Sequence, residues 1–243
     1  ITDGYAIVGD HTDDDENVID VIHSCKNDVK KIAYKALPSK NENRKNQVLY
    51  NEVPIEISVF GEHNMKNMSA ALEVCRQLGI ADASFYASIA SFNGAAKRLE
   101  TVYDSENGSI FRDFAHAPSK VRATVKAVKA RNPGRKLLAV FELHTFSSMN
   151  KQFLSNYKDS LDPADLAVVF FSPHAFELKR LEMFSLDFVK KSFGREDLMV
   201  FNDIEDLRFF LHKEIQPNSN LLMMSSGNFD GMIIDSLFDK LEN

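Results

Sequence analysis

The amino-acid sequence predicts an α/β fold whose main part is a mostly parallel sheet with helices on both faces. In the second half of the chain, short apolar runs alternate with segments of helical spacing. This alternation is typical of the βαβ units that build such a sheet. The expected strands cover residues 137–141, 166–171, 198–201 and 221–224, and the expected helices lie near 149–160, 176–193, 203–214 and 230–242. Polar residues follow the strands, at the edge where such sheets bind ligands. They are Glu142 and His144, Ser172 and His174, Asn202 and Asp203, and Ser225 to Asn228.

Composition narrows the class of protein. The chain has 243 residues, 44% of them apolar, which is enough for one large core or two smaller ones. It contains no run of 18 apolar residues and no signal-peptide pattern, so we expect a soluble intracellular protein. The net charge is -6 and the basic residues are scattered, which argues against a nucleic-acid partner. Cys25 and Cys75 lack metal or redox spacing and are expected to be free, buried thiols.

The first elements of the chain are short. Residues 5–8 and 31–34 are expected strands, and a helix is expected through residues 18–22. The acidic run at residues 13–16 precedes that helix and lacks the spacing and glycine of a calcium loop, so we interpret it as a solvated helix N-terminus. Residues 38–46 are polar and rich in turn formers, which predicts a loop.

The pattern becomes clearer from residue 55. Alternating apolar and polar residues predict a strand over residues 55–59, followed by a helix over 65–78 that ends at Gly79. Asn64 is placed to cap this helix. A second helix is expected over residues 85–92, and a segment of small residues then leads to Lys97 and Arg98.

Residues 107–130 combine a turn, a strand, a polar loop and a helix start. Asn107-Gly108 is the pair that a type I′ hairpin turn prefers, because both central residues of that turn need positive φ. A strand begins at residue 110, and Pro118 suits the first turn of the next helix. Asp113 and His116 lie between them, beyond a strand end and beside a helix N-terminus. A ligand site and a capping Asp with a surface His are both open interpretations at this point.

Three of these segments resemble motifs of the Mur ligases, which are ATP-dependent amide-forming enzymes of peptidoglycan synthesis. Residues 61–67 (GEHNMKN) resemble the GxHNxxN motif of that family. Residues 92–100 (FNGAAKRLE) resemble its FxGxxRRxE segment, and residues 113–118 (DFAHAP) resemble DYxHxP. The three occur in the family's order, so the resemblance is strong over roughly residues 55 to 130.

Two later segments extend the resemblance. Residues 140–147 look like the FxPHRxxR stretch of the members that use UDP-N-acetylmuramate, although Thr145 and Ser148 stand where arginines are usual. Residues 225–231 (SSGNFDG) resemble the SNGGFGG loop of the murein tripeptide ligases more than the GAGNIG loop of the alanine-adding branch. Ala117 replaces a His common to both branches. The resemblance favours the tripeptide-adding branch, which acts in peptidoglycan recycling, with the alanine-adding branch as the nearest alternative.

The resemblance also implies a domain organisation. The phosphate-binding pattern GxxxxGK[ST] does not occur in the sequence. We therefore expect a fragment in which residues 1–95 are the C-terminal part of the α/β ATP-binding central domain and residues 96–243 are the Rossmann-like C-terminal domain. A fragment without the phosphate-binding loop is expected to be inactive alone.

The implied chemistry is amide formation in the bacterial cytoplasm, away from membranes. ATP phosphorylates the carboxylate of UDP-N-acetylmuramate with the help of Mg²⁺, and a peptide or amino-acid amine attacks the acyl phosphate. The resemblance assigns nucleotide binding to His63, Asn64, Asn67, Arg98 and Asp113, a catalytic role to His116, and substrate binding to His144, Ser226 and Asn228. No metal ligand is assigned. A non-catalytic nucleotide-binding module and a folate polyglutamate ligase are the other classes considered.

Overall fold

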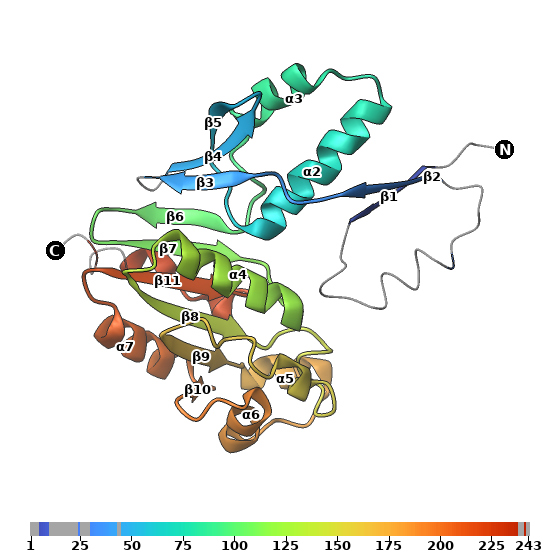
Figure 1. The fold of residues 1–243 in the computed structure, drawn as a ribbon. Coiled ribbons are helices and arrows are strands. Elements are labelled where there is room, and N and C mark those ends of the chain that lie inside the picture. Colours follow the sequence, from blue (N-terminus) through green and yellow to red (C-terminus); the bar gives the residue numbers. More distant parts are fainter. Residues whose placement is uncertain (1–4, 10–23, 25–29, 43–44, 238–240, 242–243) are drawn as a thin grey trace. The chain divides into compact units, whose positions relative to one another are not determined.

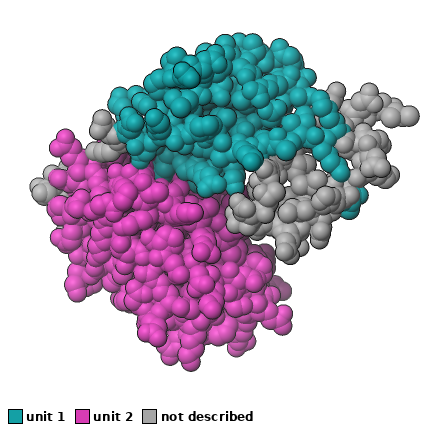
Figure 2. All heavy atoms as spheres, in the orientation of Figure 1, with its two compact units in different colours: residues 1–93 teal, residues 94–243 magenta. Residues whose placement is uncertain are grey.

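The computed structural model describes residues 5–9, 24, 30–42, 45–237 and 241, and the chain forms two compact units, residues 1–93 and 94–243 (Figure 2). The expected helix over residues 18–22, the acidic run at 13–16 and Cys25 lie outside the described residues. Cys75 is a free thiol, as predicted, but it is half-buried rather than buried. Within the described ranges, no helix is long and apolar enough to cross a membrane.

The first unit contains two small sheets. Strands β1 (Tyr5–Gly9) and β2 (Lys30–Tyr34) pair in parallel, and strands β3 (Ser39–Glu42), β4 (Lys45–Tyr50) and β5 (Val53–Ile57) pair antiparallel in the order β3-β4-β5. The loop predicted over residues 38–46 is wrong, because β3 and the start of β4 lie within it. All four residues of β3 are exposed, so main-chain pairing at a sheet edge forms this strand and its polar composition gave no sign of it.

Two helices complete the first unit. Helix α2 (Glu62–Gln77) is followed by Gly79 with φ +76°, as predicted, and helix α3 (Asp82–Ile89) follows it. The predicted cap is wrong, because the N-cap of α2 is Gly61 with φ 89° and Asn64 lies inside the first turn. The core residues of this unit come from both the sheet and the helices. They are Val48, Ile57, Val59, Met65, Met68, Leu72, Phe85, Tyr86 and Ile89.

The second unit is built on a six-stranded, mostly parallel sheet, which confirms the predicted fold class. Its strands are β6 (Glu100–Asp104), β7 (Gly108–Asp113), β8 (Lys136–Glu142), β9 (Leu166–Phe170), β10 (Met199–Phe201) and β11 (Ser219–Met224). They lie in the order β10-β9-β8-β11-β7-β6, and only β6 runs antiparallel to its neighbour (Figure 1). Strand β11 therefore enters the sheet between β8 and β7, and the polar loops after these three strands become neighbours.

Helices of the second unit agree with the predictions in part. They are α4 (Pro118–Arg131), α5 (Pro173–Lys179), α6 (Leu186–Phe193) and α7 (Ile204–Glu214), with 3₁₀ turns at Leu154–Tyr157, Phe229–Gly231 and Ile234–Leu237. The single helix expected over 176–193 is wrong, because Arg180 adopts φ 55° and ends α5. The helix expected over 149–160 is a series of turns, begun by the Asn150 side chain accepting the amides of Gln152 and Phe153. The described part of 230–242 begins with turns because Asp230 is left-handed.

Packed layers cover both faces of this sheet. Leu138 and Val140 of β8 face the cluster that contains Leu207 and Leu211 of α7. Phe141, the next residue along the strand, points to the opposite face and contacts the rings of Tyr157 and Phe193, at centroid distances of 5.1 Å and 6.4 Å. The sheet is therefore buried on both sides, which explains its continuous apolar strands.

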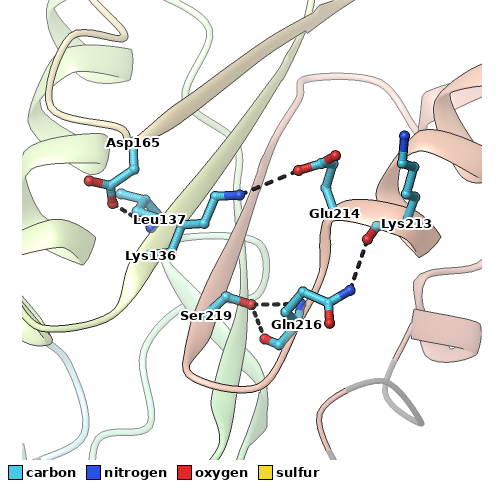
Figure 3. Close-up of polar contacts among 7 residues, drawn as sticks. All are labelled: Lys136, Leu137, Asp165, Lys213, Glu214, Gln216 and Ser219. Atoms are coloured by element: carbon cyan, nitrogen blue, oxygen red, sulfur yellow. Dashed lines mark hydrogen bonds and ion pairs between the residues drawn. The ribbon is translucent and has the colours of Figure 1, made fainter.

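The polar residues at the amino ends of the strands differ in role from those at the carboxyl ends. At the amino ends of the strands, Asp165 accepts the amide of Leu137 at 2.7 Å, Lys136 pairs with Glu214 at 3.3 Å, and Ser219 closes the turn at Gln216 (Figure 3). These contacts satisfy local main-chain and charged groups. The polar residues singled out in the sequence of this unit lie mainly at the opposite, carboxyl ends of the strands.

Candidate functional site

Three loops meet at the carboxyl edge of the second unit. Met224, the last residue of β11, is in register with Asp113 of β7 and Phe141 of β8. The next amide, that of Ser225, donates a hydrogen bond to the main-chain oxygen of Asp113 at 2.9 Å. The segments after residues 113, 142 and 224 are thus held side by side, although they are far apart in the sequence.

Asp113 is the acid of the first loop. Its side chain is buried, its Oδ1 accepts the amide of Ala115 at 2.6 Å, and its Oδ2 accepts the hydroxyl of Thr124 at 3.2 Å. Burial raises the pKa of this carboxyl, and the bonds from Ala115 and Thr124 and the charge of Arg98 partly oppose the increase. The N-cap of α4 is Ala117, without a side-chain cap, so Asp113 organises the loop and does not cap the helix.

Arg98, Phe114 and His116 form a second group beside this acid. The guanidinium carbon of Arg98 lies 4.8 Å from the centroid of the Phe114 ring, and the His116 ring meets the same ring edge-on at 5.2 Å. His116 Nδ1 forms a hydrogen bond with the main-chain oxygen of Phe114 at 2.9 Å, and Tyr157 donates its hydroxyl to the main-chain oxygen of His116. The structure therefore brings a cation and an imidazole into contact with one aromatic ring.

The loops after β8 and β11 form a third group. Glu142 Oε2 accepts the amide of Phe229 at 3.0 Å and the hydroxyl of Ser225, whose oxygen accepts the amide of Gly227 at 2.6 Å. Gly227 packs directly on His144, because a Cβ at residue 227 would lie 2.6 Å from His144 Cδ2. His144 and the loop after β11 are therefore in contact, as their places at the strand ends predicted.

Ser226 and Asn228 flank Gly227 in that loop. The hydroxyl of Ser226 is buried and, within the described part of the chain, has no hydrogen-bond partner. Asn228 is exposed and precedes the 3₁₀ turn Phe229–Gly231. The loop therefore carries one exposed amide side chain, which can bond a polar group, and one buried hydroxyl that lacks a partner among the described residues.

The nucleotide-binding residues predicted in the first unit lie at the start of α2. Asn64 donates its Nδ2 to the main-chain oxygen of Phe60 at 2.8 Å, which leaves its oxygen available as an acceptor. His63 is half-buried and Asn67 is exposed in the next turn. Asn64 and Asn67 are three residues apart and lie on the same side of the helix.

Two positions that differ from the expected motif form a turn of their own. The hydroxyl of Thr145 accepts the amide of Ser148 at 3.1 Å, and the Ser148 hydroxyl donates to the main-chain oxygen of Thr145 at 3.0 Å. Short hydroxyl side chains therefore close this loop at the two positions where the motif usually has arginines. Across the described ranges, no group of three or more His, Cys, Asp or Glu residues is placed to hold a metal ion.

Glu142 is the residue that the sequence-based site prediction left out. It was recognised as a polar residue after an apolar strand, but no role was given to it. The signal in the sequence is an acid that directly follows five apolar residues, at a place where a charged side chain is buried only with partners. Its partners lie more than 80 residues later in the chain, so only the fold could identify them.

Comparison with known proteins places these loops in a family. A family model described as Mur ligase, glutamate ligase domain, matches residues 97–227. A UDP-N-acetylmuramate–L-alanine ligase of Gloeothece citriformis (strain PCC 7424) is 30% identical over 192 residues, which cover 77% of this chain and 38% of that protein. The chain thus spans well under half the length of this relative.

Two solved structures are similar in fold. A MurF structure from Acinetobacter baumannii matches with a TM-score of 0.68 and 17% identity, covering 100% of this chain and 52% of that one. A murein peptide ligase structure from Psychrobacter arcticus 273-4 matches with a TM-score of 0.61 and 19% identity, again covering 100% and 52%. At these identities the similarity concerns the fold alone.

Proposed function

The chain belongs to the Mur ligase family, and we propose that it is part of an ATP-dependent ligase that joins an amine to the carboxylate of UDP-N-acetylmuramate. Family members are ATP-dependent ligases of peptidoglycan synthesis. The observation that carries the proposal is the meeting of Asp113, His116, His144 and Ser226 on three adjoining loops. In this proposal residues 1–95 belong to the central domain, residues 96–243 form the C-terminal domain, and the enzyme works in the bacterial cytoplasm.

Each group in the site has a proposed role. Asp113 and Arg98 bind the nucleotide, Asp113 by accepting hydroxyl hydrogen bonds and Arg98 by its positive charge. Asn64 binds the base, and His63 and Asn67 shape that pocket. His116, whose ring meets that of Phe114 edge-on, faces the transferring phosphate in this proposal, where an imidazole can exchange a proton or stabilise negative charge. In this proposal the reaction also uses Mg²⁺, which would neutralise charge on the phosphates of ATP when bound.

The loop after β11 supports the choice of amine. His144, Ser226 and Asn228 are proposed to bind the amine substrate and to orient its nitrogen for attack on the acyl phosphate. The SSGNFDG sequence of this loop favours a murein tripeptide, as used in peptidoglycan recycling. L-alanine is the second candidate, because the curated relative from Gloeothece citriformis is an L-alanine ligase by name.

Amide formation by the complete gene product tests the proposal. ATP, Mg²⁺ and UDP-N-acetylmuramate are supplied with either the tripeptide L-alanyl-γ-D-glutamyl-meso-diaminopimelate or L-alanine, and ADP and the product mass are measured. We expect ADP release that depends on the amine, with the tripeptide as the better substrate. A tenfold preference for L-alanine would assign the protein to the second candidate. Nucleotide binding without an amide product from either amine would identify a non-catalytic module.

A further inference from the structure

Glu142 has a buried carboxylate at the end of the central strand β8. Only 2% of its surface is exposed. A carboxylate taken out of water is costly unless its oxygens receive hydrogen bonds, so the partners of this group indicate why the position carries an acid.

Among the residues that the structure describes, these partners belong to the loop after β11. Oε2 accepts the amide of Phe229 at 3.0 Å and the hydroxyl of Ser225. Because the single proton of that hydroxyl points to the carboxylate, the Ser225 oxygen is the acceptor for the amide of Gly227, at 2.6 Å. One carboxylate oxygen therefore fixes three places in a five-residue loop, two directly and one through a hydroxyl.

The loop needs such a restraint because its backbone is strained. Phe229 and Asp230 have φ of 50° and 49°, in the left-handed region that residues with a side chain seldom adopt. Such conformations persist where surrounding contacts over-determine them. The amide that begins the strained pair is the one that Glu142 holds, and the Phe229 ring is buried beside Phe170 at a centroid distance of 6.1 Å.

The same loop fixes the position of His144. A Cβ at residue 227 would lie 2.6 Å from His144 Cδ2, 2.8 Å from His144 Cγ and 3.0 Å from Glu142 Oε2. Gly227 is thus the point at which the loop, the imidazole and the carboxylate touch. A shift of the loop would move the surface on which the imidazole rests.

We propose that Glu142 is a positioning residue, whose carboxylate holds residues 225–229 so that Ser226, Asn228 and His144 are pre-arranged for the amine substrate. The proposal rests on the proposed function for the identity of that substrate. Glu142 acts through the loop and does not itself touch the substrate. Its loss is expected to raise the KM for the amine and leave the KM for ATP unchanged.

Hydrogen exchange on this chain tests the hold on the loop without any need for activity. E142A should speed exchange at the amides of Gly227 and Phe229 by about tenfold or more. The Phe229 amide loses its acceptor, and the Ser225 hydroxyl that accepts the Gly227 amide is no longer held by the carboxylate. E142Q keeps one acceptor oxygen without its charge and should give an intermediate rate. D203A is the matched control, since Asp203 also follows a strand and accepts two amides, those of Glu205 and Asp206, but only caps α7.

Kinetics of the complete gene product tests the consequence for the substrate. E142A should raise the KM for the amine about tenfold or more, as expected for a displaced substrate-binding group, with E142Q between it and the wild type. D203A should change neither the KM for the amine nor exchange at Gly227 and Phe229. If E142A and D203A raise the KM for the amine and speed exchange at Gly227 and Phe229 equally, the proposal is overturned, because both variants would then report general destabilisation.

A second variant covers the case in which E142A does not fold. G227A keeps Glu142 and Ser225 but places a methyl group against His144 and close to Glu142 Oε2, so it should raise the KM for the amine. Wild-type KM in G227A, or wild-type exchange at Gly227 and Phe229 in a folded E142A, would refute the proposal. If exchange in E142A changes as expected but the wild type ligates no amine, the proposed function is wrong. The role of Glu142 in holding the loop would then still stand.

Discussion

Gly108 and Ser219 lie opposite each other on the neighbouring strands β7 and β11, so close that Gly108 has no room for a side chain. A Cβ at Gly108 would come within 2.3 Å of the main-chain oxygen of Ser219 and within 2.7 Å of a Leu241 side-chain carbon. Neither Asn107 nor Gly108 has positive φ, so the predicted type I′ turn is wrong. The connection is a longer loop, in which Ser105 donates its amide to the oxygen of Gly108 at 2.9 Å. The glycine is needed for the close approach of two strands.

The variant G108A should therefore destabilise the second unit. The added methyl group meets main-chain atoms that cannot move without disturbing the sheet, and overpacking of this kind costs about 1–3 kcal/mol. G134A is the matched control, because a Cβ at Gly134 meets nothing within 4 Å. Urea unfolding of both variants gives the free energies. A G108A protein as stable as G134A would mean that the strands separate easily at this place.

The raised pKa of Asp113 should appear in the pH dependence of stability. A carboxyl whose pKa is higher in the folded state binds its proton more tightly there, so its contribution to stability declines as pH rises above the ordinary value of 3.8 and through the raised pKa. The difference in unfolding free energy between the wild type and D113N should therefore decrease as pH rises through that range.

Asp165 provides a comparison of opposite sign. Burial acts to raise its pKa, but the Lys129 ammonium and the Leu137 amide outweigh burial and lower it. Its contribution is complete above pH 3.8 and is lost as pH falls through the lowered pKa. The difference between the wild type and D165N should thus increase with pH over that lower range. Equal slopes for D113N and D165N would contradict the assignment for Asp113.

Asp113 should also affect nucleotide binding by the complete gene product. If its carboxylate accepts hydroxyl groups of ATP, D113A loses a charge-assisted hydrogen bond, worth roughly 1.5–3 kcal/mol. The KM for ATP should rise accordingly, and the KM for UDP-N-acetylmuramate should not change. An unchanged KM for ATP would restrict Asp113 to its observed contacts with Ala115 and Thr124.

Tyr157 stabilises the loop that contains His116 by a hydrogen bond to the main-chain oxygen of that residue. Burial raises the pKa of Tyr157 to about 12, so the hydroxyl keeps its proton and its hydrogen bond to His116 at physiological pH. Y157F removes that bond and leaves a carbonyl oxygen without its donor, at a cost of about 0.5–1.5 kcal/mol. Urea unfolding measures the loss. An alkaline absorbance difference between wild type and Y157F that appears near pH 10 would contradict the raised pKa.

The chain by itself is predicted not to turn over ATP. Its sequence has no GxxxxGK[ST] pattern, whose loop cradles the phosphates of ATP. Purified protein of this sequence should release no more ADP than a heat-denatured sample, with or without UDP-N-acetylmuramate and an amine. Steady ADP release that scales with the concentration of the chain would show that other residues bind the phosphates.

Local sequence patterns determined much of the fold. The strands β8, β9 and β11 were predictable because they are buried on both faces and appear as continuous apolar runs. Pro118 and the valines that follow it predicted the start of α4. Local patterns failed where long-range contacts decide the conformation, as in the exposed strand β3 and the left-handed residues Arg180 and Asp230.

For the site, the sequence determined which residues stand at the ends of strands, and the tertiary structure decided which of them meet. His144 and Ser226 could be selected as polar residues after apolar runs, because a parallel sheet gathers such ends along one edge. The sequence could not show that β11 lies between β7 and β8, since strand order depends on the packing of all layers at once. That order alone brings the loop after β11 onto Glu142, whose buried carboxylate requires partners that no neighbour in the sequence supplies.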